Sequence, residues 1–197
     1  MLSRIARTIL VLAALRGSLL PLAGCAQSHG GRIYTSDNWP QQKSSLGKIA
    51  LYVAGNDPGN PTYNHPAQIN AILTQILAKF PNTTILPVTD AHNAAFSKDL
   101  SDPDALAYAK KAGADTICVL SVSDYEGQFS IGLSIPYLLF WDLHTRAIYS
   151  LRLLDVKTGS LLLHTVSYRQ SGGLFGFWDC TDLQKNLRLK LQSDLKP

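Results

Sequence analysis

The chain has 197 residues, of which 46% are hydrophobic and 16% are charged. This balance excludes a disordered chain, which would have few apolar and many charged residues, and the length suits a single domain. Three of the 18 basic residues, Arg4, Arg7 and Arg16, lie in the first 24 positions, where there is no acid, so the rest has 15 basic and 14 acidic side chains. With no basic surface expected, we predict no nucleic-acid partner.

Residues 1–24 have the pattern of a bacterial signal peptide. Arg4 and Arg7 form a charged start, an apolar stretch follows, and small residues lead to Cys25. The string Leu22-Ala23-Gly24-Cys25 resembles the lipobox of bacterial lipoproteins. This resemblance implies cleavage before Cys25 and lipidation of that cysteine with several acyl chains such as palmitate, which together anchor a protein stably. An ordinary signal with a chance cysteine, or a single buried anchor, is the alternative.

The residues after the cysteine carry two further predictions. Ala26 stands where Gram-negative lipoproteins retained at the inner membrane usually have an aspartate. The resemblance therefore implies an outer-membrane location, at the periplasmic face. Residues 26–45 are polar, contain glycine and lack periodicity, so we predict that 25–45 is a lipidated cysteine with a flexible tether. The periplasmic domain is then 46–197.

The domain alternates predicted strands and helices. Strands are predicted over 48–53, 83–88, 116–122, 147–154 and 161–168, and helices from Pro66 to Phe80, from Asp102 to Gly113, and from Thr181 to Leu195. Pro66 suits a first helical position. Asp102 and Pro103 suit an N-cap and first residue, and Gly113 suits a C-cap. The run 116–122 is apolar throughout, as in a central strand covered on both faces.

The clearest local pattern is a hairpin that turns at Gly159. Residues 147–154 alternate in polarity, and Gly159 can supply the positive φ of a short loop. In the last helix, Thr181 and Gln184 match a capping box, and leucines recur every four residues at 183, 187, 191 and 195. The order β-α-β-α-β-β-β-α predicts an α/β domain with a single mixed sheet of about five strands, covered by helices.

Two turn motifs resemble a group of bacterial envelope lipoproteins. They are Ala112-Gly113-Ala114-Asp115, a helix exit into the central strand, and Asp155-Val156-Lys157-Thr158-Gly159, which joins two long strands. The group includes the curli secretion lipoprotein, lipoprotein activators of penicillin-binding proteins, and lipoproteins with a TolB amino-terminal-like domain. The resemblance covers about residues 46 to 195. It implies this fold and an envelope location, because these motifs set turns and caps rather than chemistry.

No catalytic or cofactor-binding constellation is recognisable in the sequence. No two histidines have the i, i+4 spacing of a helical zinc site, and no serine lies in a G-x-S-x-G motif. The pairs Asp90/His92 and Asp142/His144 are each only a local pair of metal ligands, and Glu126 is the only glutamate. We therefore predict a protein that is not an enzyme, with no metal and no cofactor.

Two cysteines remain if Cys25 is lipidated. In the oxidising periplasm Cys118 and Cys180 can pair, provided that the last helix starts over the central strand. The alternative is one buried thiol and one partly covered thiol. A redox-active pair is disfavoured because the two do not form a CxxC motif.

Two apolar segments have no place in the predicted core. Residues 131–141 have no charge, and 172–178 are rich in glycine and aromatic residues. The first is extra core or an edge flap, a protein-contact surface, or a membrane hairpin like that of the curli channel. For the second we predict an interface made by Leu174, Phe175, Phe177 and Trp178, because exposed apolar patches usually mark contacts.

These observations predict a lipoprotein anchored to the outer membrane that acts without catalysis by binding other envelope components or itself. It would be an accessory or assembly subunit of a secretion, transport or cell-wall machine. One alternative is an oligomeric channel component of the curli-secretion type. Another is a periplasmic hydrolase or metal-binding protein.

Overall fold

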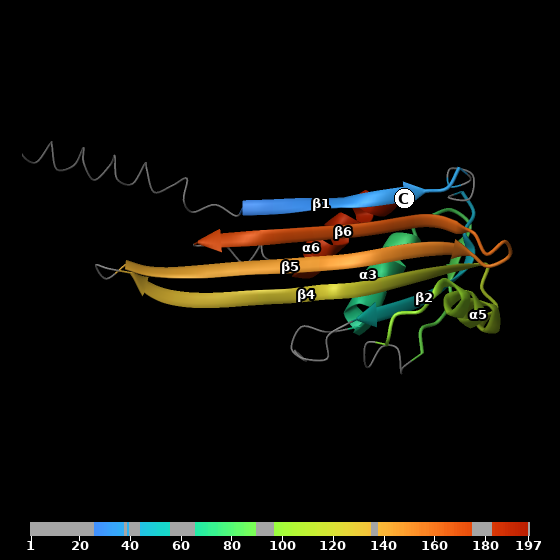
Figure 1. Ribbon diagram of the computed structural model, residues 1–197, viewed down its shortest axis with the longest axis horizontal. Helices are drawn as coiled ribbons and strands as arrows, with labels where there is room; N and C mark the ends of the chain where they lie inside the picture. Colours follow the sequence, from blue (N-terminus) through green and yellow to red (C-terminus); the bar gives the residue numbers. More distant parts are fainter. Residues whose placement is uncertain are drawn as a thin grey trace, which may run out of the picture.

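One mixed sheet organises the molecule. The computed structural model describes residues 26–37, 39, 44–55, 66–89, 97–134, 138–174 and 183–196. The elements are β1 (Ala26–Thr35), β2 (Gly47–Gly55), α3 (Pro66–Leu77), β3 (Thr83–Ile85), α5 (Asp102–Ala112), β4 (Thr116–Ser134), β5 (Leu138–Asp155), β6 (Leu161–Leu174) and α6 (Leu183–Leu195). The sheet has six strands in the order β1-β6-β5-β4-β2-β3 (Figure 1). The predicted α/β fold is confirmed, and from β2 onward the elements follow the predicted order.

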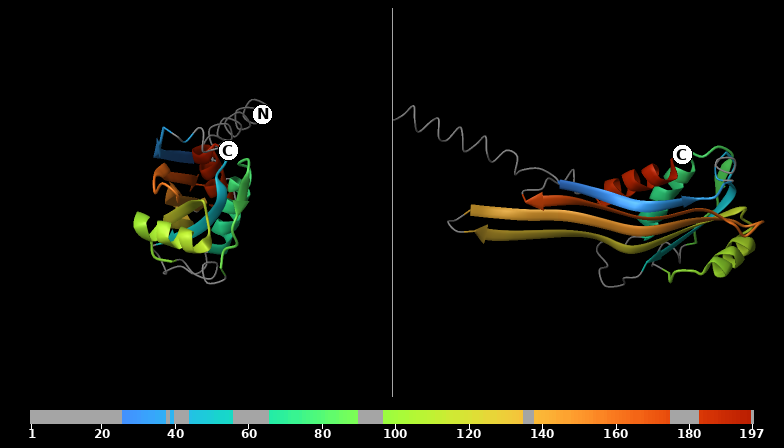
Figure 2. Two further views of the ribbon diagram at one scale, coloured as in Figure 1. Left: turned by 90° about the vertical axis from the view of Figure 1, so that its right-hand side faces the viewer. Right: turned by 45° about the horizontal axis from the view of Figure 1, so that its top comes forward.

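Helices cover the two faces of this sheet unequally. Helices α3 and α6 lie along one face, and α5 packs against the other near one end (Figure 2). The α3/α6 face carries the larger core, in which Ile69, Leu120 and Leu151 are fully buried. The α5 face is built from small residues such as Ala105 and Ala109 against β2 and β4. None of the helices in the described ranges has the length and hydropathy to cross a membrane.

The sixth strand corrects the predicted tether. Residues 26–35 form β1, which pairs antiparallel with β6 over its whole length, from Ala26↔Gly172 to Thr35↔Leu163. Beyond β1, the Trp39 side chain is buried and its ring contacts Phe80 at a centroid distance of 6.2 Å. The folded body thus starts at least as early as residue 26, and the predicted boundary at residue 46 is wrong.

The glycine pair in β1 explains why this segment resembled a tether. Tyr168 lies across from Gly30, and a Cβ atom on Gly30 would come within 2.8 Å of the Tyr168 ring. A Cβ atom on Gly31 would lie 2.5 Å from the Ser167 hydroxyl oxygen. A Cβ atom on Gly31 would also lie 2.6 Å from the backbone carbonyl oxygen of Val166, so glycine is needed there for the close approach of β1 to β6, a use that composition alone does not distinguish from flexibility.

The helix ends follow the predicted signals with one shift. Helix α3 begins at Pro66, as predicted. Helix α5 begins at Asp102, but its N-cap is Ser101, whose hydroxyl accepts a hydrogen bond from the Asp104 amide, so Asp102 is the first helical residue. Gly113 is the C-cap, with a φ of 70°. At such a φ glycine avoids the steric cost that other residues meet.

The two turn motifs meet at one end of the sheet. The Asp115 carboxylate accepts a hydrogen bond from the Lys48 amide at 2.8 Å, and the Asp115 carbonyl accepts one from the Val156 amide at 2.9 Å. In the hairpin turn, the Asp155 carboxylate accepts a hydrogen bond from the Thr158 amide at 2.7 Å. The motifs therefore fasten β2, β4 and the β5–β6 turn together, which is a structural role.

At the other end, β4 and β5 extend well past the rest of the sheet. They pair antiparallel from Thr116↔Asp155 to Ser134↔Leu138, with a register shift between Val122 and Asp124. The uncharged segment 131–141 thus forms the far end of this hairpin, apart from residues 135–137, which lie outside the described ranges. Its described residues are continuous with the sheet (Figure 1).

Candidate interaction surface

Strands β1 and β6 present a face that none of the described helices covers. An open groove of about 810 Å³ runs along them, lined by Gly31, Arg32, Ile33, Tyr34, His164 and Val166. Three large side chains on this side are strongly exposed: Tyr34 at 56%, Val166 at 49% and Tyr168 at 42%. Neither β1 nor β6 contains an acidic residue, whereas Arg32 belongs to the groove. The surface therefore combines apolar contact area with positive charge.

Over residues 165–168, the polarity of β6 is inverted relative to an ordinary strand, whereas Leu162 and Leu163 before them are buried in the usual way. Thr165 and Ser167 point into the α6 side and are buried, while Val166 and Tyr168 alternate with them and are exposed. Amphipathic strands normally bury their apolar residues and expose their polar ones. Two features explain the inversion: a polar layer that satisfies the buried hydroxyls, and the absence of a covering element among the described residues on the open side.

The polar layer is centred on Asp194 of α6, which is nearly fully buried. Its carboxylate accepts hydrogen bonds from the Tyr149 hydroxyl at 2.8 Å, the Ser167 hydroxyl at 2.6 Å and the Thr165 hydroxyl at 3.2 Å. The Lys190 ammonium, one turn earlier in α6, forms an ion pair with the same carboxylate. Burial, and secondarily the Asp194 charge, raises the pKa of Tyr149 above its usual value, so Tyr149 remains a donor to this network.

A second part of the layer surrounds Asn186, one turn before Lys190. The Asn186 amide donates to the Thr145 hydroxyl at 2.9 Å and to the Ser171 hydroxyl at 2.5 Å. Its carbonyl oxygen accepts a hydrogen bond from Arg169 at 3.0 Å. Helix α6 thus has an apolar stripe and, beside it, a buried polar stripe. The predicted leucine stripe is confirmed at 187, 191 and 195, whereas the polar stripe at 186, 190 and 194 was not predicted, although its four-residue spacing is visible in the sequence.

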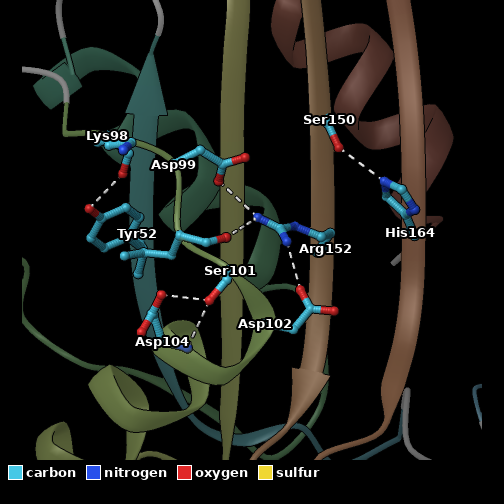
Figure 3. Close-up of polar contacts among 10 residues, drawn as sticks. Tyr52, Lys98, Asp99, Ser101, Asp102, Asp104, Ser150, Arg152 and His164 are labelled. Atoms are coloured by element: carbon cyan, nitrogen blue, oxygen red, sulfur yellow. Dashed lines mark hydrogen bonds and ion pairs between the residues drawn. The ribbon is translucent and has the colours of Figure 1, made fainter.

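Arg152 marks the boundary between the open area and the part covered by α5. Its guanidinium donates to Asp102 at 2.6 Å, to Asp99 at 2.8 Å and to the Leu100 carbonyl at 2.7 Å (Figure 3). The Tyr52 hydroxyl donates to the Lys98 carbonyl at 2.9 Å on the same segment. These contacts hold residues 98–102 against the sheet, so Arg152 is already engaged in the fold.

Ser150 and His164 are in contact across two strands on the described open face. They are the only such pair there whose residue types match those of a catalytic site. The Ser150 hydroxyl and His164 Nε2 lie 3.0 Å apart (Figure 3). A serine nucleophile also needs an acid that orients the histidine and donors for an oxyanion. No described carboxylate is hydrogen-bonded to His164, and Ser150 lies within a strand whose backbone pairs with both neighbours. This pair fits a cross-strand hydrogen bond better than an active site.

Most of the predicted site residues fall outside the described ranges. This applies to Cys25, Cys180, Phe175, Phe177 and Trp178, so lipidation, the disulfide and the aromatic interface remain predictions. Leu174 is the last residue of β6, where it pairs with Asp142.

Cys118 lies in the core on the α3/α6 face, where it is fully buried and forms no disulfide with any described residue. Burial raises the pKa of this thiol to about 12, so it is protonated and unreactive at neutral pH.

The two predicted pairs of metal ligands gain no support as sites. Asp90 and His92 lie outside the described ranges, and the side chains of Asp142 and His144 are not described although both residues belong to β5. Within the described part of the chain, no three residues among histidine, cysteine, aspartate and glutamate gather as metal ligands would.

Comparison with known proteins relates this chain to others by fold. No protein-family model matches the sequence. No curated protein matches it by sequence either. Among solved structures, the PelC dodecamer from Paraburkholderia phytofirmans superposes with a TM-score of 0.51 at 12% identity, over 85% of this chain and 97% of that one.

Two further structures match with lower scores. Lipoprotein GNA1162 from Neisseria meningitidis gives a TM-score of 0.41 at 14% identity, over 75% of this chain and 93% of that one. The C-terminal domain of LpoB from Salmonella enterica gives 0.37 at 12% identity, over 68% and 85%. Of these three structures, only PelC superposes with a TM-score above 0.5, and at 12% identity that likeness is one of fold.

Proposed function

We propose that this protein is a non-catalytic accessory subunit of an envelope machine, anchored through Cys25 to the periplasmic face of the outer membrane. In this function it binds another protein through the open face of β1 and β6. The observation that carries the proposal is the inverted polarity of β6, with buried Thr165 and Ser167 and exposed Val166 and Tyr168. A strand that places its apolar side chains outward is suited to a contact with a partner.

The position of β1 supports a protein partner. It lies at the edge of the described sheet, with β6 on one side only. An edge strand presents unpaired amide and carbonyl groups, to which an extended segment of a partner can add as a further strand. The neighbouring exposed side chains of Tyr34, Val166 and Tyr168 would supply apolar contacts, and Arg32 would favour an acidic segment.

A second copy of the chain is the first partner to test. The PelC structure that shares this fold is a dodecamer. Self-association through an edge strand would place copies side by side on a membrane to which each is anchored. The fold shared with PelC and the position of β1 at the edge of the described sheet support this proposal.

The experiment is crosslinking in cells that produce the full chain, followed by purification of the captured complexes. The double variant Tyr34→Ser with Val166→Ser should lose the captured partner while its melting temperature stays close to that of the wild type. The matched control is Leu189→Ser, because Leu189 is an apolar residue of α6 with 42% exposure. If both variants lose the partner, or neither does, the open face is not the contact surface.

The anchor is tested separately. The variant Cys25→Ser should abolish incorporation of labelled fatty acid and shift the protein out of the membrane fraction, because the acyl chains supply the membrane affinity. Wild-type protein without labelled fatty acid would show that Cys25 is not lipidated.

A redox role for Cys118 is disfavoured, because burial of its side chain raises the pKa of the thiol.

A further inference from the structure

One hydrogen bond shows which residues of β1 direct their backbone groups away from the described sheet. Just beyond β1, the Ser36 amide donates to the Leu162 carbonyl at 2.9 Å. In an antiparallel ladder, residues that exchange hydrogen bonds with the partner strand alternate with residues whose amide and carbonyl groups point to the other side. Even-numbered residues of β1 therefore bond to β6. The outward-facing residues are the odd-numbered ones, Gln27, His29, Gly31, Ile33 and Thr35.

The groove on the candidate surface follows this edge. Its lining includes Gly31 and Ile33, which lie on the α6 side of β1, and also Arg32 and Tyr34, which lie on the open face. The side chain of Ile33 is 46% exposed and that of Tyr34 is 56% exposed. A groove lined by both sides of one strand fits an added strand better than a compact ligand.

Strand β1 lacks most of the features that keep edge strands from pairing with other chains. Proline, charged side chains, a bulge or short length usually protect such an edge. β1 is 10 residues long, contains no proline and pairs with β6 without a register shift. Arg32 is its only lysine, arginine or acidic residue. The edge is therefore suited to accept a further strand.

The pairing of β1 with a second β1 is limited to a few registers. Outward backbone groups must meet, so odd-numbered residues lie opposite odd-numbered ones. A two-fold axis at Arg32 would place two guanidiniums opposite each other, and like charges in that position are destabilising. An axis at Gly31 would place Tyr34 opposite Ser28. An axis at Ile33 places the two Ile33 side chains opposite each other, and Arg32 of each copy opposite Tyr34 of the other.

We propose that two copies of this chain join edge to edge through β1, antiparallel, about a two-fold axis at Ile33. This inference rests on the proposed function and specifies the second copy as the partner. In this register each Arg32 guanidinium lies beside the Tyr34 ring of the other copy, which permits a cation–π contact on the open face. The two described sheets become one continuous sheet, with both open faces on the same side.

Cysteine crosslinking tests the register. Residues of a hydrogen-bonded antiparallel pair have Cα atoms about 5.5 Å apart, a separation that a disulfide accommodates. The full chain with Ile33→Cys, purified in detergent and oxidised, should form a dimer in which mass spectrometry finds position 33 linked to position 33. The matched control is Val166→Cys, which should not link to itself, because the two β6 strands would be three strand spacings apart, about 14 Å.

Proline substitution tests the outward edge of β1. The variant Ile33→Pro removes an amide that faces away from β6, so it should convert the dimer to a monomer in analytical ultracentrifugation while the melting temperature stays close to that of the wild type. The control Ile33→Val keeps this amide and should remain dimeric. Arg32→Ala should weaken the dimer about 5- to 30-fold, because two cation–π contacts are lost. Circular dichroism reports folding, and the crosslink at position 33 is decisive if Ile33→Pro does not fold.

The outcomes separate this inference from the proposed function. A dimer that is linked at position 33 and abolished by Ile33→Pro supports the pairing of β1 with β1. An oligomer that lacks this link, or that persists in folded Ile33→Pro, overturns this pairing and leaves self-association through another part of the open face. A monomeric wild type also overturns it. The proposed function then stands only if cells yield another captured protein that is lost in the double variant Tyr34→Ser with Val166→Ser.

Discussion

Strands β5 and β6 have one face under helix α6 and one open face. The two faces differ in which polar and apolar side chains they carry. Under the helix lie fully buried Leu151 and Leu153, but also the hydroxyls of Thr165 and Ser167. The open face carries exposed Val166 and the Ser150–His164 hydrogen bond. Residue polarity therefore does not predict burial over residues 165–168 of β6. The hydroxyls of Thr165 and Ser167 can be buried there because Asp194 of α6 accepts their hydrogen bonds.

The comparison indicates that α6 is attached to the sheet in two ways. Its leucines contribute burial of apolar area, which is not directional. Its polar stripe at 186, 190 and 194 contributes hydrogen bonds that fix the position of the helix along β5 and β6. A buried polar network specifies one geometry when every member has a partner and is costly when one partner is removed. Variants of each region can separate these contributions.

The largest effect is expected for Asp194→Ala. This change leaves the buried Lys190 ammonium without its ion-pair partner and removes the acceptor of Tyr149, Thr165 and Ser167. Breaking one side of a buried ion pair costs about 3–5 kcal/mol of unfolding free energy. Chemical denaturation measures this loss. The double variant Lys190→Met with Asp194→Leu should lose less than Asp194→Ala alone, because no unpaired charge remains. Equal losses would show that the pair itself, not the orphaned charge, is responsible.

A pair of apolar truncations compares the two faces directly. Leu151→Ala on β5 removes a fully buried side chain and should cost about 2–5 kcal/mol through lost burial and a cavity. Val166→Ala on β6 should change stability by less than about 0.5 kcal/mol, because its side chain is half exposed. Both values come from denaturation midpoints of the purified chain. A large loss at Val166 would mean that this face is covered within one chain and is not free for a partner.

An intermediate effect is expected at the boundary between the open and α5-covered areas. Arg152→Met removes the contacts to Asp99, Asp102 and the Leu100 carbonyl. The two aspartates are about half exposed, so solvent screening reduces the loss to about 1–2 kcal/mol. Amide hydrogen exchange should accelerate over residues 98–102 and remain unchanged in β6. Arg152→Lys should restore only part of the stability, because an ammonium cannot reproduce the planar fork. Unchanged exchange over 98–102 would contradict this role.

The sequence predicted the elements whose signals are local. The stripe of α3, the C-cap at Gly113 and the alternation of β5 each depend on residues within a few positions of one another. Strand β1 was missed because its evidence is non-local: the glycines at 30 and 31 acquire meaning only beside Tyr168 and Ser167 of β6. A polar edge strand and a tether have the same composition when the partner strand is unknown.

The candidate surface was missed for a related reason. Apolar patches were sought as continuous runs, such as 131–141 and 172–178, whereas the open face is assembled from alternate residues of two strands. Its signal in the sequence is the order Thr165-Val166-Ser167-Tyr168, which alternates correctly but does not say which set is buried. That choice depends on α6, whose Asp194 accepts the hydrogen bond of Ser167 from 27 residues further along the chain.

A modest loss of stability is expected at Gly159, in the turn that joins β5 to β6. Its φ is 71°, in the left-handed region that favours glycine. A Cβ atom there would meet only the Leu106 side chain at 3.6 Å, which is ordinary contact, so the cost of Gly159→Ala is backbone strain of about 1 kcal/mol. Gly113 is the matched control, because it has a φ of 70° and a Cβ atom added to it would have no neighbouring atom within 4 Å. Equal losses of about 1 kcal/mol in thermal denaturation would confirm that conformation, not packing, requires glycine at both positions. A larger loss at Gly159 would instead show that the turn must pack against α5, which would make the α5 side of the sheet as demanding as the α6 side.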